Sequence, residues 1–198
     1  AYLNDLGAQE LADRYMGHAE SFGAGEPVVV KCRIQIQSAR GQEQDALELA
    51  KSSMNDGIGN RWGSHDAILR TIGTAAVQDG DFDDIIEMYQ RRHPQLFTSV
   101  PEISPDNVAI AANLAWLLQQ AGRPQRATEI IDAALSWYRS TQPEGVHGYN
   151  LGIVDVRLLA LAGETDLALE TLREAVDSGW RMGWQWRMSN PALDDIRS

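Results

Sequence analysis

The chain contains little of the chemistry that marks several common protein classes. Its 198 residues include one cysteine, Cys32, so no internal disulfide can form. No apolar run approaches the roughly 18 residues that suggest a membrane-spanning helix. Lys and Arg number 17 against 28 Asp and Glu, which gives a net charge of −11. We therefore expect no nucleic-acid binding and no docking on an anionic membrane, because both depend on basic side chains.

Metal, cofactor and catalytic patterns are also missing. No two of the four histidines have the i, i+4 spacing of helical metal ligands, and these residues are His18, His65, His93 and His147. Residues 64–66 read Ser-His-Asp, but neighbours in sequence cannot converge as a hydrolase triad. Residues 57–63 are glycine-rich like a phosphate loop, yet no strand precedes them. The acidic run that starts at Asp79 has Asp84 where a calcium loop needs glycine. We predict no metal, no cofactor and no catalytic residue.

What the chain does have is a recurrent pattern. A glycine is followed five residues later by alanine or isoleucine, and four residues after that by a large or apolar residue. The five copies are Gly7–Ala12–Met16, Gly41–Ala46–Ala50, Gly80–Ile85–Tyr89, Gly122–Ala127–Ile131 and Gly163–Ala168–Leu172. Successive glycines lie 34, 39, 42 and 41 residues apart. A recurrence of this length indicates one supersecondary unit stacked on copies of itself.

The residues around each glycine have helical periodicity. On both sides of Gly122 the apolar positions recur three or four residues apart, and Pro124 is suited to open the second helix. Residues 104–106, Ser-Pro-Asp, predict the start of the first helix. The expected helices are 8–22, 27–40, 43–55, 64–79, 82–92, 105–121, 124–140, 147–162, 165–178 and 191–197. Since no segment is typical of a strand, we predict an all-α fold of antiparallel helical hairpins.

The pattern resembles the tetratricopeptide repeat, a helix–turn–helix unit of helices A and B with small residues where the two cross. The copy that turns at Gly122 matches through Leu114, Ala115, Leu118, Ala127, Ile131 and Ala134, and the copy at Gly163 through Leu159, Ala168, Leu172 and Ala175. The resemblance implies an α-solenoid with a right-handed superhelix. We expect residues 1–198 to form a single repeat domain that turns at the five glycines and is capped by residues 180–198.

The C-terminus carries a second resemblance. Residues 179–181, Gly-Trp-Arg, then Trp184 and Trp186, then residues 190–197 are similar to the end of repeat regions in bacterial signalling proteins. Those regions follow a winged-helix, adenylate cyclase or kinase domain. Only six residues precede Gly7, so we expect the chain to be a fragment of such a protein. The expected compartment is the cytoplasm, or the periplasm if a membrane span lies upstream.

The tryptophans of this C-terminal stretch have two interpretations. Trp180, Trp184 and Trp186 form either a ligand platform or a plug that covers the open end of the last hairpin. Because the terminal repeat of a solenoid must cover its exposed core, we favour the plug.

The family resemblance also indicates where a ligand would bind. Its concave groove is lined mainly by helix A, and Asn113 matches an asparagine that binds peptide backbone in several members. The corresponding residues are Lys31, Gln35, Arg70, Thr74, Asn113, Trp116, Gln119, Gln120, Asn150 and Arg157. The three basic residues among them could take a carboxylate, or could simply pair with acids on neighbouring helices. The chaperone-tail clamp of the family needs other residues where Thr74 and Val154 stand, so we do not predict that ligand.

Three functions remain open. We expect a non-catalytic regulatory module that binds a protein or peptide segment, including an acidic one, in its groove. The alternative is a scaffold that self-associates into homodimers through apolar surface on an end hairpin. An enzyme is the third and weakest hypothesis, because no titratable groups converge in the sequence. A separate catalytic domain in the parent protein is compatible with all three.

Overall fold

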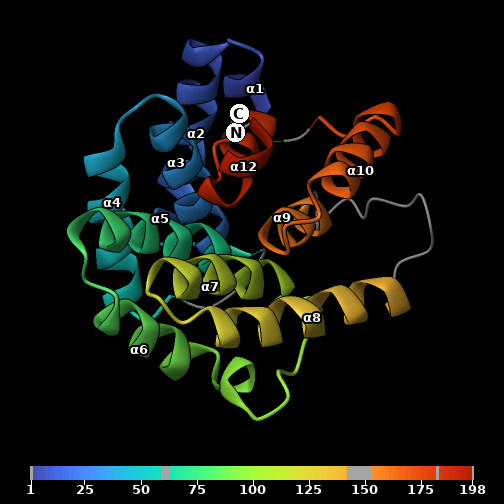
Figure 1. Ribbon diagram of the computed structural model, residues 1–198. Helices are drawn as coiled ribbons and strands as arrows, with labels where there is room; N and C mark the ends of the chain where they lie inside the picture. Colours follow the sequence, from blue (N-terminus) through green and yellow to red (C-terminus); the bar gives the residue numbers. More distant parts are fainter. Residues whose placement is uncertain (1, 59–62, 142–152, 182, 198) are drawn as a thin grey trace. The chain divides into compact units, whose positions relative to one another are not determined.

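The computed structural model describes residues 2–58, 63–141, 153–181 and 183–197, and all regular elements in these ranges are helical (Figure 1). The elements are α1 (Tyr2–Asp5), α2 (Gln9–Gly23), α3 (Pro27–Ala39), α4 (Glu43–Asn55), α5 (Ser64–Asp79), α6 (Asp83–Arg92), η1 (Pro94–Phe97), α7 (Val108–Gln120), α8 (Pro124–Thr141), α9 (Val154–Leu161), α10 (Thr165–Asp177), α11 (Trp184–Met188), η2 (Pro191–Leu193) and α12 (Asp194–Arg197). The predicted all-α class is confirmed.

The recurrent glycines end helices in the left-handed conformation. The φ angles are 78° at Gly7, 71° at Gly41, 73° at Gly80, 69° at Gly122 and 80° at Gly163. In the turn after α7, the backbone N–H of Gly122 donates to the carbonyl of Gln119, and that of Arg123 donates to Leu118 at 2.8 Å. These bonds satisfy carbonyls that the helix end would otherwise leave without partners. Glycine occupies this position because a Cβ atom disfavours a positive φ.

The chain forms two compact units. The N-terminal unit contains residues 1–75 and also residues 182–189, which return to it from the far end of the sequence. The C-terminal unit contains residues 76–181 and 190–198. Each unit is therefore built from hairpins of the repeat together with a short piece of the C-terminus.

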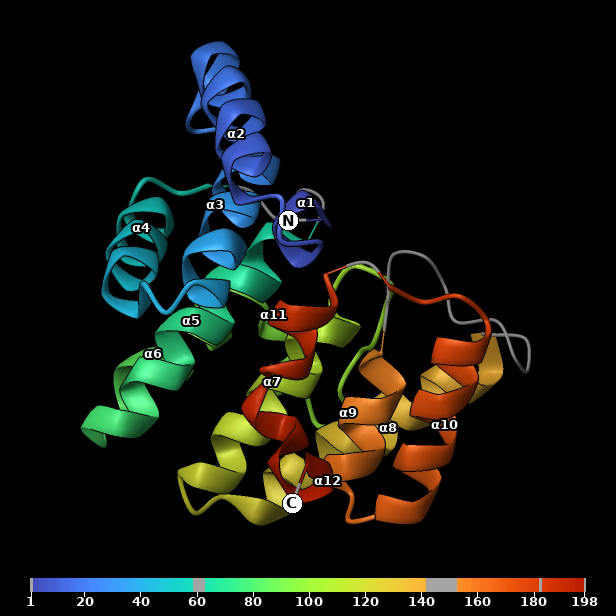
Figure 2. The same ribbon diagram turned by 90° about the horizontal axis from the view of Figure 1, so that it is seen from above.

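In the N-terminal unit, successive helices pack along the chain. Helix α2 contacts α3, and α3 contacts α4 (Figure 2). Ile34 of α3 and the alanines Ala46 and Ala50 of α4 are fully buried. The alanines leave no side chain beyond Cβ, which lets the two helices approach closely. This explains the alanine five residues after Gly41.

The C-terminal unit repeats the arrangement with α7 against α8 and α9 against α10. Helix α9 also contacts α7 and α8, so one hairpin stacks on the next. Leu114 of α7, Ala127 of α8 and Ala168 of α10 have no exposed surface. The repeat solenoid predicted from these positions is confirmed, whereas the right-handed sense of the superhelix stays a prediction.

Helix α7 begins three residues later than predicted. Residues 105–107 form a turn, and Asn107 organises it with its side chain. Its Oδ1 accepts from the backbone N–H of Ser104 at 2.9 Å, and its Nδ2 donates to the carbonyl of Glu102 at 2.9 Å. The expected cap and first turn at Ser104–Asp106 therefore belong to the preceding loop. The predicted helix 147–162 is described only from residue 153, and α9 begins at Val154.

Three short elements were not predicted: α1, η1 and α11. They have four or five residues each, which is too few for hydrophobic periodicity to show. The element that matters most for function is α11, because it brings residues of the C-terminus into the N-terminal unit.

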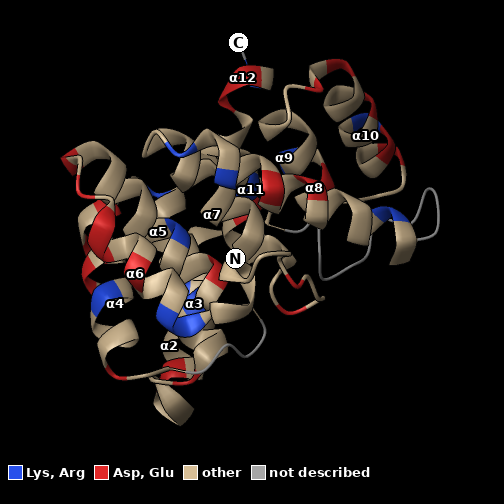
Figure 3. Cartoon of the chain, turned by 60° about the horizontal axis from the view of Figure 1, so that its bottom comes forward, with Lys and Arg blue, Asp and Glu red and all other residues tan. Residues whose placement is uncertain are grey.

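The charges of the chain are unevenly placed on its helices (Figure 3). Helix α10 carries four acids, at 166, 170, 174 and 177, and one base, Arg173. In contrast, α3 carries Lys31 and Arg33 and no acid. Within the described residues, no helix is both long and apolar enough to cross a bilayer.

Candidate functional site

In the N-terminal unit, a C-terminal segment packs on the first helices of two hairpins. Residues 183–189, which we call the return segment, contain α11, and α11 contacts α3. Trp186 of this segment is only 4% exposed. The guanidinium carbon of Arg70, on α5, lies 4.0 Å from the centroid of the Trp186 ring. A cation stacked on tryptophan at this distance is attracted by the electron-rich ring face.

Arg70 also holds the backbone of the return segment. One terminal nitrogen, Nη1, donates to the carbonyl oxygen of Trp186 at 2.7 Å, and Nη2 donates to the hydroxyl of Ser189 at 3.1 Å. Arg70 itself is 8% exposed. One guanidinium therefore binds the ring, the main chain and a side chain of the same short segment, which uses the planar fork that lysine lacks.

Lys31, on α3, senses the charges of the residues around this contact. Burial lowers the pKa of Lys31 below its usual value; the nearby carboxylate of Asp66 opposes this, and the cation of Arg187 in the return segment adds to it. The segment thus brings a second positive charge toward a lysine that is already partly desolvated. The receiving surface therefore presents both a cation, Lys31, and an anion, Asp66, near Arg187.

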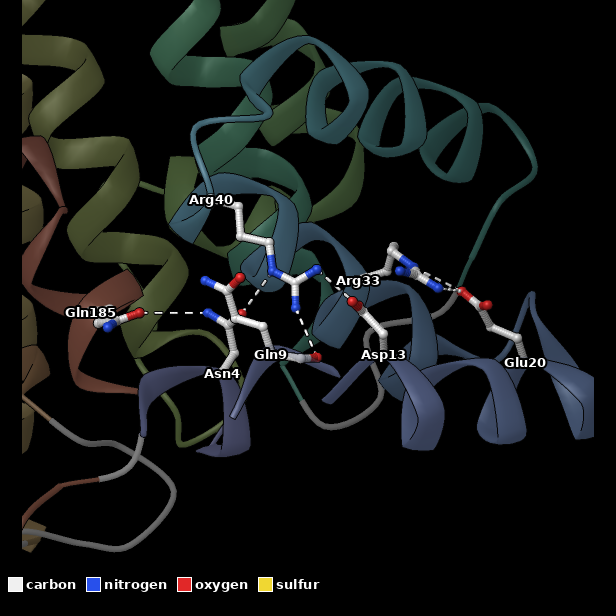
Figure 4. A network of polar contacts seen from close by, with 7 residues as sticks. All are labelled: Asn4, Gln9, Asp13, Glu20, Arg33, Arg40 and Gln185. Atoms are coloured by element: carbon white, nitrogen blue, oxygen red, sulfur yellow. Dashed lines mark hydrogen bonds and ion pairs between the residues drawn. The ribbon is translucent and has the colours of Figure 1, made fainter. Parts of the chain in front are cut away.

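A network of polar side chains ties α1, α2 and α3 to the return segment (Figure 4). Nδ2 of Asn4 donates to Oε1 of Gln185 at 3.5 Å, while Oδ1 of Asn4 accepts from Nε of Arg40 at 2.8 Å. Arg40 also bonds the carboxylate of Asp13 at 2.8 Å. Asn4 is 4% exposed, so the network reaches from the surface to a buried amide. A separate pair, Arg33 with Glu20, links α3 to α2 at 2.8 Å.

In the C-terminal unit, the last residues of the chain lie on the first helices of two hairpins in the same way. Element η2 contacts α7 and α9. Oδ1 of Asn113, on α7, accepts from Nη1 of Arg157 at 2.9 Å and from Nδ2 of Asn190 at 3.3 Å. These three side chains are between 2% and 4% exposed. Asn190 also caps η2, because its Oδ1 accepts from the backbone N–H of Ala192 at 2.9 Å.

Comparison with known proteins identifies the repeat. The tetratricopeptide repeat family model matches residues 76–145, from the end of α5 through α8. Over these residues the chain is similar to the tetratricopeptide repeat family, which supports the resemblance predicted from the sequence. No curated protein and no solved structure matches the sequence. Tetratricopeptide repeats generally mediate protein–protein interaction and are generally non-catalytic.

In tetratricopeptide terms, α3, α5, α7 and α9 are the helices A predicted to line a groove. The structure brings Lys31, Gln35 and Arg70 into the N-terminal unit, where Gln35 and Arg70 are buried and Lys31 is half-buried. Asn113 and Arg157 meet in the C-terminal unit. Both sets lie on helices that the C-terminal residues contact. We call the contacted surfaces of these helices the helix A faces.

The remaining predicted residues are placed differently. The hydroxyl of Thr74 donates to the carbonyl of Arg70 at 2.9 Å, within its own helix. Nε2 of Gln119 donates to the carbonyl of Leu161 at 3.0 Å and so joins α7 to α9. Trp116 is half-buried and Gln120 is exposed. Asn150 lies outside the described residues. The assignment of all these residues to a ligand groove stays a prediction.

The tetratricopeptide pattern gave no indication of three residues that meet the helix A faces: Trp186, Ser189 and Asn190. A signal for them was present, since the tryptophans and the Asn-Pro pair stand out in the sequence. We expected the tryptophans to cover the last hairpin. Instead Trp186 packs on Arg70 in the N-terminal unit, while Trp184 is 45% exposed.

A groove lies in the C-terminal unit, lined mainly by α8, a helix B. This open groove of about 760 Å³ follows α8 and is bordered by the end of α9 and the start of α10. Its lining consists of Thr128, Ile131, Asp132, Leu135, Ser136, Arg139, Ser140, Leu161, Ala162 and Glu164. No histidine or cysteine is among these lining residues. In the part of the chain that the structure describes, no three His, Cys, Asp or Glu residues are grouped to hold a metal ion.

Proposed function

We propose that the chain is a non-catalytic module that binds a protein or peptide segment on its helix A faces. The observation that carries this proposal is the way Arg70 holds a short segment of polypeptide by its carbonyl and its aromatic ring. Main-chain contacts give affinity for any peptide, and a stacked ring adds selectivity. Asn113 occupies the position of a backbone-binding asparagine of the family, and here it bonds the side chain of Asn190.

The proposed partner segment is acidic. The chain as a whole has a net charge of −11, yet Lys31 and Arg70 place cations on the helix A face of the N-terminal unit. A carboxylate near Lys31 would gain a charge-assisted contact there. Long-range repulsion from the acidic remainder of the protein would be screened at physiological salt, while a close and partly buried pair would be screened much less.

A peptide library selected against the whole chain tests the proposed function. We expect selected peptides to bind about tenfold more weakly to a Trp116→Ala variant, because Trp116 is half-buried on α7, a helix A. The matched control is Trp137→Ala, which removes an equally half-buried tryptophan from α8, a helix B. Fluorescence anisotropy with the selected peptides measures both affinities. Equal weakening in the two variants, or a library without binders, contradicts the proposal.

We further propose that the module regulates a bacterial signalling or transcription-regulatory protein in the cytoplasm. The support is the sequence of the C-terminus, whose residues 179–197 resemble the end of such repeat regions. The sequence encoded upstream of residue 1 tests this. A winged-helix or adenylate cyclase domain there supports the regulatory role, and a secretion signal or a domain with only a structural role there contradicts it.

Self-association is a second candidate, and one observation favours it. Helix α2 exposes Leu11, Tyr15 and Phe22 to 37%, 58% and 80%, and their spacing places them on one side of the helix. An apolar stripe of this kind is a candidate interface between copies. Analytical ultracentrifugation should then show a dimer that Phe22→Glu dissociates, whereas Val100→Glu, at an equally exposed site of the C-terminal unit, leaves it intact. A monomer at high concentration excludes this function.

A further inference from the structure

We infer that the return segment, residues 183–189, is a built-in ligand of the helix A face of the N-terminal unit, and that an outside peptide with an equivalent tryptophan anchor displaces it. The inference rests on the proposed function and names the chemistry of one partner. It concerns only the N-terminal unit, so it is tested apart from the peptide selection described above.

The return segment is held like a bound peptide. The return segment is distant in sequence from the helices it touches, and the hydrogen bond from Arg70 to Trp186 spans 116 positions. The contacts are those of a recognised peptide: one buried aromatic anchor, one main-chain carbonyl and one hydroxyl, all held by a single arginine. Gln185 adds a side-chain contact to Asn4 beside this anchor. A buried aromatic residue with polar contacts around it is the usual anatomy of a binding hot spot.

The return segment is too short to be a stable helix by itself. Helix α11 has five residues, from Trp184 to Met188, far fewer than an isolated helix needs in water. Its structure therefore depends on docking. Gly183 precedes it with a φ of 66°, a left-handed conformation that glycine adopts easily and that turns the chain where the segment begins. An element ordered only by docking opens more readily than the hairpins beneath it.

The return segment is anchored by one of its two tryptophans. Trp186 is buried, whereas Trp184 beside it remains 45% exposed. A peptide that supplies a tryptophan and a main-chain carbonyl for Arg70 therefore offers the contacts that hold the chain's own segment.

The experiment uses the full chain and a fluorescent peptide with the sequence of residues 183–189. A Trp186→Ala chain loses its own anchor but keeps Arg70 and Lys31, so we expect it to bind the peptide. The wild-type chain should bind at least about tenfold more weakly, because its face is occupied. The matched control is Trp184→Ala, which removes an exposed tryptophan and should behave like the wild type. A second peptide with Trp186→Ala should bind the Trp186→Ala chain at least about tenfold more weakly than the first, because it lacks the anchor.

Hydrogen exchange on the wild-type chain gives a test that does not require a folded variant. The amides of Arg187 and Ser189 donate within α11, to Gly183 and Gln185. We expect them to exchange faster than the amides of α5, and an excess of the peptide of residues 183–189 to accelerate them further by displacing the segment.

Each outcome is decisive. Exchange of α11 only together with α5, or equal peptide binding by the wild-type and Trp186→Ala chains, overturns the inference. Success here combined with a failed peptide selection on α7 would place binding in the N-terminal unit alone. A successful peptide selection together with failure of these experiments would support the proposed function and overturn the inference that the return segment is a built-in ligand.

Discussion

A Leu114→Ala substitution is expected to lower the free energy of unfolding by about 2–5 kcal/mol, the largest effect we predict for one apolar residue. Leu114 has no exposed surface and lies on α7, which packs against both α8 and α9. Truncation removes a buried side chain at the centre of the repeat and leaves a cavity that the close alanine contacts around it cannot refill. Urea unfolding followed by far-ultraviolet circular dichroism measures the loss.

The control for this prediction makes the same chemical change in the same unit. Leu167 on α10 is 42% exposed, so Leu167→Ala should cost less than about 1 kcal/mol. If the two variants lose similar stability, the prediction that Leu114 is a core residue of the repeat is wrong, and the core of the C-terminal unit lies elsewhere.

The hairpins could be predicted because their information is local. A left-handed glycine with an amphipathic stretch on each side determines a helix end, a turn and a helix start within about a dozen residues. This is why α8 begins at Pro124, as predicted, and why all five repeat glycines have positive φ. The predicted start of α7 was wrong because the side chain of Asn107 bonds the backbone of Glu102 and Ser104 and holds the preceding residues in a turn, and the sequence does not reveal which side chain organises that turn.

The candidate site could be predicted only in part. The resemblance to the tetratricopeptide repeat implied that Arg70 and Asn113 are binding residues of helices A, and the structure places each on a helix that residues of the C-terminus contact. It could not identify Trp186 as the partner of Arg70, because their contact joins residues 116 positions apart and no repeat relates them. A short segment held only by docking has too few residues for periodicity to register.

The same site yields the second large prediction, at Asn113. Leucine at this position keeps the approximate shape of the side chain but removes the oxygen that accepts from Arg157 and Asn190. Arg157 is 4% exposed, so its guanidinium would lose an acceptor where water cannot readily replace it. We expect Asn113→Leu to lower the free energy of unfolding by about 3 kcal/mol, measured by urea unfolding.

Asn113→Asp separates the role of the oxygen from that of the packing. A carboxylate retains an acceptor for both donors and adds a charge opposite to that of Arg157, so the loss should be about 1 kcal/mol or less. This difference would establish that Asn113 stabilises the helix A face by accepting hydrogen bonds, which is also what binding a peptide main chain requires. If aspartate costs as much as leucine, the Asn113 oxygen does not stabilise the cluster, and the C-terminal residues are held on α7 and α9 by apolar contacts such as that of Leu193, which has no exposed surface.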